Sequence, residues 1–107
     1  MGDRSKSTLY STLLAYLQER GVDLRSGGSA ERGLHLEDAI GFIELLSQNG
    51  VRPLGIEPWR EMSGRYRIDS LGVWESNSED PQVCNSEAKQ VIERLRLGER
   101  DVITIQF

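Results

Sequence analysis

Two pairs of residues in this chain have types and spacings that could support nucleophilic catalysis. Ser86 and Lys89 match the Ser-x-x-Lys spacing of serine–lysine acyl-transfer enzymes, and Cys84 and His35 are the only cysteine and the only histidine. The motifs that accompany the serine–lysine signature are missing, so Ser86 is interpreted as a helix cap. Cys84 is expected to lie half-buried in a loop, and His35 to sit at a helix entry or in a loop hydrogen bond. A metal site at His35 is disfavoured, because no second His or Cys stands at ligand spacing.

Glu57 and Glu61 could share acid–base work as a pair of carboxylates. Arg60 and Arg65 flank them, so we expect surface ion pairs instead. Such pairs contribute about 1 kcal/mol or less each when exposed.

The remaining catalytic and cofactor motifs are missing from the sequence. It contains no G-x-S-x-G elbow, no H-E-x-x-H, no second cysteine and no Walker-type loop. The glycine pair in Ser26-Gly27-Gly28-Ser29 is not followed by the Lys-Ser/Thr of a phosphate-binding loop. We therefore predict a protein that is not an enzyme and that needs no cofactor and no metal.

The composition is that of a small globular domain. The chain has 107 residues, of which 37% are hydrophobic and 28% charged, so a single domain over residues 1–107 is expected. No apolar run approaches the roughly 20 residues that span a bilayer, and the first residues are too polar for a signal peptide. A lone thiol suits a reducing compartment. These features predict a cytoplasmic protein that does not bind membranes.

The negative charge is concentrated in one segment. The net charge is −4, and Glu75, Glu79, Asp80 and Glu87 stand in a stretch without a basic residue. A local acidic patch could steer a basic partner, although a merely solvated loop gives the same pattern. Nucleic-acid binding is disfavoured, because phosphate contacts need clustered cations and the basic residues here are scattered.

Hydrophobic periodicity predicts three helices and three strands. The helices are expected at residues 7–20, at 36–48 and from Ser86 to just before Gly98, and a loop at 22–33. The strands are expected at 51–59, 65–75 and 101–107.

Two details of the strands can be predicted as well. Prolines bracket the first strand, which favours an edge position. In the second strand the alternation changes phase near Asp69-Ser70, so we expect a one-residue bulge there.

The order α-α-β-β-α-β favours an α+β (two-layer α/β) fold. We expect a three-stranded mixed sheet with the helices packed on one face, the last strand parallel to the second through a right-handed crossover. One sheet face or edge would stay exposed as a docking surface, and such an edge would also allow a homodimer.

Residues 36–74 carry a family resemblance. A helix is followed by Asn49-Gly50-Val51-Arg52-Pro53-Leu54-Gly55-Ile56-Glu57-Pro58, a charged turn and a strand ending in Trp74, and then by a helix with Ser86 and Ala88 and a final apolar strand. This order is similar to the bacterial polymorphic-toxin immunity protein family numbered forty, over roughly the last two-thirds of the chain. Ile56-Glu57 departs from the Gly-Asp of the family pattern. The resemblance implies a cytoplasmic protein that binds and neutralises a cognate toxin.

A partner-binding surface can be predicted from the aromatic and charged residues of the hairpin and the acidic loop, since aromatic residues and Arg are the usual interface anchors. Its residues are Trp59, Arg60, Glu61, Trp74, Glu75, Glu79 and Asp80. Core positions are the competing interpretation for both tryptophans.

Two other functions remain open at this point. One is a regulatory or adaptor module that binds a different protein. The other is a small-ligand-binding domain with a pocket between the helices and the sheet.

Overall fold

The chain forms an α+β structure with three α-helices and two antiparallel sheets. The computed structural model describes residues 3–107, so the first two residues of the expected domain lie outside the described part. None of the helices within this part combines the length and apolar composition that a membrane-spanning segment requires. The elements, with η for short 3-10 turns, are α1 (Asp3–Arg20), β1 (Val22–Asp23), η1 (Arg25–Gly27), β2 (Arg32–Gly33), α2 (Leu36–Gln48), β3 (Gly55–Met62), β4 (Arg65–Ile68), η2 (Ser70–Gly72), β5 (Trp74–Glu75), α3 (Pro81–Leu95) and β6 (Val102–Gln106).

The helices follow the predicted periodicity, but α3 begins earlier than expected. α2 has the predicted bounds, and His35 occupies its N-cap position as a helix-entry residue. At α3, Asp80 is the cap, and its Oδ1 accepts a hydrogen bond from the Gln82 N–H at 2.9 Å. Pro81 follows in the first turn, where its missing N–H is harmless. The prediction that Ser86 caps this helix is therefore wrong, and Ser86 lies inside α3.

The main sheet has four strands, and every hydrogen-bonded pair in it is antiparallel. β3 pairs with β4 and β5 along one edge and with β6 along the other. The predicted three-stranded mixed sheet is wrong for two reasons. The second strand is divided into β4 and β5, and β6, although parallel in direction to both, is separated from them by β3.

The prolines do not place β3 at an edge, because Pro58 faces an interruption of the neighbouring strand. The Pro58 carbonyl accepts a hydrogen bond from the Asp69 N–H at 2.8 Å. In an antiparallel strand the N–H and C=O positions of one residue point the same way, so the nitrogen of Pro58 also faces this side. η2 replaces the strand there, and no ladder partner needs the missing N–H.

The interruption lies where the sequence predicted a bulge, but it is larger. Trp59 pairs with Ile68 and Ile56 pairs with Trp74, so three steps along β3 correspond to six along its neighbour. η2 accommodates the additional residues. The Asp69 carboxylate stabilises the turn by accepting a hydrogen bond from the Leu71 N–H at 3.2 Å.

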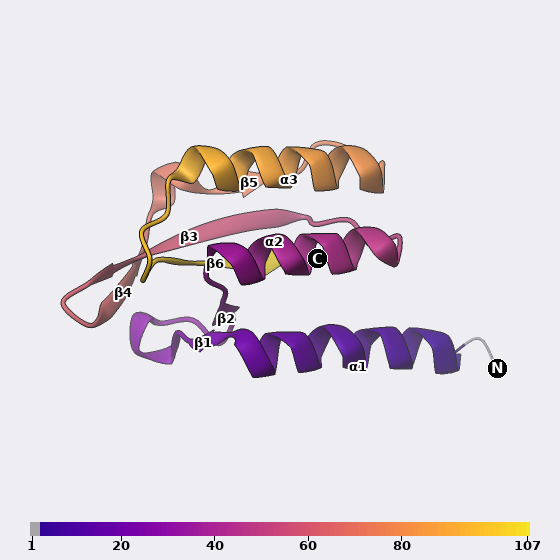
Figure 1. Ribbon diagram of the computed structural model, residues 1–107, viewed down its shortest axis with the longest axis horizontal. Coiled ribbons are helices and arrows are strands. Elements are labelled where there is room, and N and C mark those ends of the chain that lie inside the picture. The colour runs from indigo at the N-terminus through magenta and orange to yellow at the C-terminus, as the bar shows by residue number, and fades with distance from the viewer. Residues whose placement is uncertain (1–2) are drawn as a thin grey trace.

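α2 and α3 cover one face of the main sheet, whereas α1 packs beside α2 and against β2. Figure 1 shows α1 on the side of α2 that faces away from α3 and β3. Burying these apolar side chains supplies most of the stabilisation that the fold requires. The buried residues of this core are Leu13, Leu34, Ala39, Phe42, Ile43, Leu46, Ile56, Ala88, Val91, Ile92, Ile103 and Ile105.

The opposite face of the sheet is partly covered by a segment that was expected to be only a loop. β1 and β2 pair with each other, and Leu34, directly after β2, bridges to Ile103 of β6. Within the segment, Leu24 packs with Trp59 and Val102 into a second buried cluster. The expected exposed sheet face is therefore closed at its Trp59 end.

Candidate functional site

The residues predicted to bind a partner do not share one surface. Trp59 lies on the sheet face under the β1–η1–β2 segment, whereas Trp74, the neighbour of Ile56, packs against the core on the helix face. Glu75, Glu79 and Asp80 are exposed, and Asp80 also caps α3. The structure thus leaves the three acids exposed and separates the two tryptophans.

Trp59 is a core residue. It is 6% exposed, and its Nε1–H donates a hydrogen bond to Thr104 Oγ1 at 3.3 Å. Gly27 of η1 lies against its ring, because a Cβ at Gly27 would come within 3.3 Å of Trp59 Cζ3 and 2.8 Å of the Tyr66 carbonyl oxygen. Direct contact between a partner and this indole would require the segment above it to open.

Arg60 connects several elements at the end of α3. Its Nε contacts Asp69 Oδ2 at 3.2 Å and its Nη1 contacts Asp101 Oδ2 at 3.2 Å. Its Nη2 donates to the carbonyl of Leu95 at 2.8 Å, in the last turn of α3, where a cation is also favoured by the helix dipole. Arg60 is therefore primarily a structural residue.

Asp101 is the centre of this polar cluster. It accepts hydrogen bonds from the Glu61 N–H and the Gly98 N–H, both at 2.9 Å, as well as the contact from Arg60. Burial acts to raise the pKa of Asp101, but the two N–H groups and Arg60 outweigh it, so its pKa lies below the ordinary value. The Glu61 carboxylate accepts a hydrogen bond from the Gly64 N–H at 2.6 Å, which holds it in the β3–β4 turn.

No strand in the described part of the chain pairs with the outer edge of β5. The Ser76 N–H donates to the Leu54 carbonyl at 2.9 Å, and Trp74 pairs with Ile56. Because main-chain groups alternate in direction along an antiparallel strand, those of Val73 and Glu75 point away from β3. These groups are free to pair with another extended chain.

Exposed apolar side chains line this edge. Leu71 is 99% exposed on η2, while Ile68 and Val73 are 42% and 40% exposed. A Leu left in water forgoes about 1.5–3 kcal/mol of burial free energy. We call the open edge with its flanking acids the β5 edge surface, made up of Ile68, Leu71, Val73, Glu75, Glu79 and Asp80.

Leu71 is presented on a fixed turn. Gly72 is wedged between two side chains, since a Cβ there would lie 2.7 Å from both Leu95 Cδ2 and Pro58 Cγ. Asp69 holds the turn from the other side, with one oxygen on the Leu71 N–H and the other on Arg60. Leu71 is thus held toward solvent by the packing of its neighbours.

The position of Leu71 in the sequence pattern does not identify it as a surface residue. Its place in an alternating pattern suggested a strand residue with a buried face. A useful signal was available, because Leu71 stands between Ser70 and Gly72 at the predicted bulge. A residue inside a bulge loses its ladder partner and the cover of neighbouring side chains.

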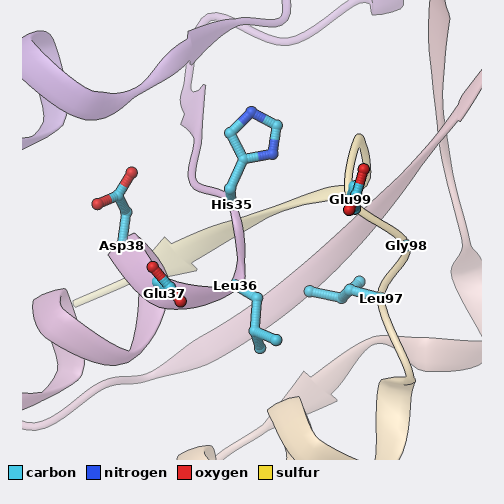
Figure 2. Close-up of a pocket in the computed structure, with 7 residues that line it drawn as sticks. All are labelled: His35, Leu36, Glu37, Asp38, Leu97, Gly98 and Glu99. Atoms are coloured by element: carbon cyan, nitrogen blue, oxygen red, sulfur yellow. The ribbon is translucent and has the colours of Figure 1, made fainter.

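A shallow cavity of about 330 Å³ lies at the start of α2. Figure 2 shows its lining from two segments, the entry of α2 and the connection from α3 to β6. Leu36 and Leu97 supply apolar surface, and Glu37, Asp38 and Glu99 supply carboxylates. His35 Nδ1 lies 3.2 Å from the Asp101 carbonyl oxygen, so the ring makes the loop hydrogen bond that was expected.

The residues that suggested nucleophilic catalysis have structural neighbours. Cys84 is fully buried in α3, not half-buried in a loop as predicted, and its Sγ lies 2.9 Å from Ser76 Oγ and 3.1 Å from the Ser78 carbonyl oxygen. Ser86 is exposed on α3, and Lys89 pairs with Glu44 at 3.5 Å.

The carboxylates that suggested acid–base work are also held by their neighbours. Glu57 accepts hydrogen bonds from Thr104 Oγ1 at 3.3 Å and from Gln106 Nε2 at 3.1 Å. Neither Glu57 nor Glu61 forms an ion pair within the described part of the chain, so the expected surface pairs with Arg60 and Arg65 are not formed.

No protein-family model matches the chain, and no curated protein matches it either. The likeness to the immunity protein family therefore stays a prediction from sequence. The functional argument rests on the surfaces described above.

Proposed function

We propose that this chain is a non-catalytic binding protein that neutralises a cognate toxin or effector protein by direct contact, as immunity proteins do. One observation carries the proposal. Leu71 is 99% exposed on a turn fixed by Gly72, at one end of an open sheet edge, and exposed acids follow the other end of that edge. An apolar side chain held in water beside unpaired main-chain groups is typical of a docking surface.

The charge of the β5 edge surface fits a basic partner. Glu75, Glu79 and Asp80 are exposed, and no ion pair within the described residues involves them. Their field would speed association with a cationic protein, and the effect would weaken as salt is added. The proposed site of action is the cytoplasm, with no cofactor and no nucleic acid required.

Co-expression tests this function directly. The tagged protein is used to capture partners from the source organism, and each captured candidate is then expressed in a neutral host with and without this chain. Restored growth with one candidate, together with a stoichiometric complex in gel filtration, is the expected result. If no captured candidate is toxic, or if toxicity persists in the presence of the chain, the immunity proposal is wrong. Capture of a non-toxic complex would instead support an adaptor role.

The cavity beside His35 supports a second candidate function, the binding of a small ligand. Its two leucines and its carboxylates suit a compact molecule with an apolar part and a cationic group. A panel of such amines would raise the melting temperature of the wild-type protein if they bind there. Leu97→Ala should abolish that rise, whereas a rise that persists in this variant would place the ligand elsewhere.

A further inference from the structure

We infer that the β5 edge surface takes up an extended, cationic segment of the partner as an added strand. The inference rests on the proposed function and names the chemistry of its partner. Three properties of the surface carry it: its open main-chain groups, its exposed apolar side chains and its unpaired acids.

The open main-chain groups define the conformation of the occupant. Val73 and Glu75 direct their N–H and C=O groups away from β3. Only a chain in extended conformation can bond to both, because its own groups repeat with the same two-residue period. A helix would satisfy its groups internally and leave these unpaired.

The side chains define the composition of the occupant. Val73 and Leu71 would contact apolar residues of the added strand, and burial of the fully exposed Leu71 contributes most of the apolar area. Glu75, Glu79 and Asp80 would attract Lys or Arg side chains. Because Val73 and Glu75 project to the same face, the occupant needs apolar residues beside Leu71 and Val73 and basic residues toward Glu75 and the acids that follow it.

A second copy of this chain does not fit the surface. Antiparallel pairing of β5 with its own copy, centred on Glu75, would place the two Glu75 side chains opposite each other. Like charges opposite each other on neighbouring strands are destabilising. The acids thus favour a foreign, basic strand over self-association.

The geometry of Val73 allows a selective test. Its φ is −66°, which is the value that proline imposes, and its N–H points outward. Val73→Pro removes one donor from the open edge, and its circular dichroism and melting temperature are compared with those of the wild type, because Gly72 before it belongs to η2 and proline restricts the residue that precedes it. Leu71→Ser removes the apolar anchor, and Met62→Ser, at a residue 63% exposed in the β3–β4 hairpin, is its matched control.

The probes are two acetylated, amidated octapeptides, four lysines followed by four valines and the reverse order, titrated to millimolar concentration into the isotope-labelled protein, so that either strand direction is tested. We expect the amide signals of Val73 and Glu75 to shift, and the affinity to fall roughly tenfold or more in Val73→Pro and Leu71→Ser but not in Met62→Ser. Backbone N-methylation of the peptide should abolish the shifts, since it removes the donors that pair with the edge. A glutamate–valine peptide should not bind.

Two outcomes would overturn the inference. One is the absence of shifts at Val73 and Glu75, and the other is equal binding of the N-methylated peptide, which would mean that charge alone attracts it. The same variants in the co-expression assay separate the two proposals. If wild-type protein protects the host and Leu71→Ser and Val73→Pro protect equally well, the edge inference fails while the immunity function stands. If wild-type protein does not protect the host, the proposed immunity function is wrong, and the peptide titration alone decides whether the β5 edge surface binds an extended chain.

Discussion

Trp59 and Trp74 lie on opposite faces of the same sheet. Trp74 pairs with Ile56, and Ile56 and Trp59 are an odd number of residues apart on β3, so their side chains point to opposite sides. Trp59 closes the small cluster with Leu24 and Val102, and Trp74 borders the main core under the helices. The two indoles therefore report on different parts of the fold.

Trp59→Ala should strongly destabilise the protein. The substitution removes a large side chain that is 6% exposed, together with one of the two hydrogen-bond donors to Thr104 Oγ1. Large-to-small changes of buried Trp reduce the free energy of unfolding by about 3–5 kcal/mol. Urea denaturation followed by far-UV circular dichroism measures the change. Trp59→Phe is the control and should retain much of the stability.

Trp74→Ala should have a smaller effect, because this side chain is only partly buried. The comparison also tests the assignment of faces. If Trp74→Ala proved more destabilising than Trp59→Ala, the β1–η1–β2 segment would not be packed on Trp59 as described.

Periodicity predicted the three helices because each one packs apolar side chains against the core, although α3 begins at Pro81 and not at Ser86. α2 matches its predicted bounds, and β6 differs from its prediction by one residue at each end. The topology of the sheet could not be read in the same way. Pro58 is acceptable in the central strand only because η2 interrupts the neighbour beside it, and that interruption depends on contacts between distant residues.

The candidate surface was predicted in part. Charge composition located the acids Glu75, Glu79 and Asp80, which are exposed. The prediction that Trp59 belongs to the binding surface was wrong. A Trp between Pro58 and Arg60 resembles an interface anchor in sequence. The segment that covers Trp59 comes from residues 22–33, far from it in the chain. Packing by a segment so distant in sequence produces no pattern in the residues around Trp59.

Gly27→Ala should loosen the β1–η1–β2 segment. The new Cβ would lie 2.8 Å from the Tyr66 carbonyl oxygen and 3.3 Å from Trp59 Cζ3, so η1 must move away from the sheet. We expect a loss of about 1–3 kcal/mol and faster amide exchange in residues 22–33. Ser26→Ala, at an exposed neighbour, is the control and should change little. Unchanged exchange rates in Gly27→Ala would argue against close packing of η1.

Cys84 should be unreactive in the folded protein. The thiol is fully buried between Ser76 and the Ser78 carbonyl, so a reagent must wait for local or global opening. Labelling with Ellman's reagent should be slow in buffer and fast in urea. Arg52→Ala offers a matched test, because Arg52 Nη1 holds the same loop through the Ser78 carbonyl at 2.7 Å. This variant should accelerate labelling, and rapid labelling of the wild-type protein would contradict the burial of the thiol.

Asp101 should make stability depend on pH in the acidic range. Its pKa in the folded protein is lower than the ordinary value of about 3.9, so the unfolded chain binds a proton more readily. The stabilisation is therefore fully present above about pH 4 and is lost as the pH falls through the lower, folded-state pKa. Asp101→Asn should reduce the free energy of unfolding by about 1.5–3 kcal/mol at pH 7, the range for hydrogen bonds to a charged group.

The difference between wild type and Asp101→Asn should shrink as the pH is lowered, because the wild-type carboxyl also becomes neutral. Urea unfolding at a series of pH values from 7 down to the acid limit of the native state measures this difference. Glu99→Gln is the control, since Glu99 is an exposed carboxylate close in sequence, and its effect should be small throughout. A gap between wild type and Asp101→Asn that stays constant with pH would show that the charge of Asp101, and with it the contact to Arg60, contributes nothing to stability.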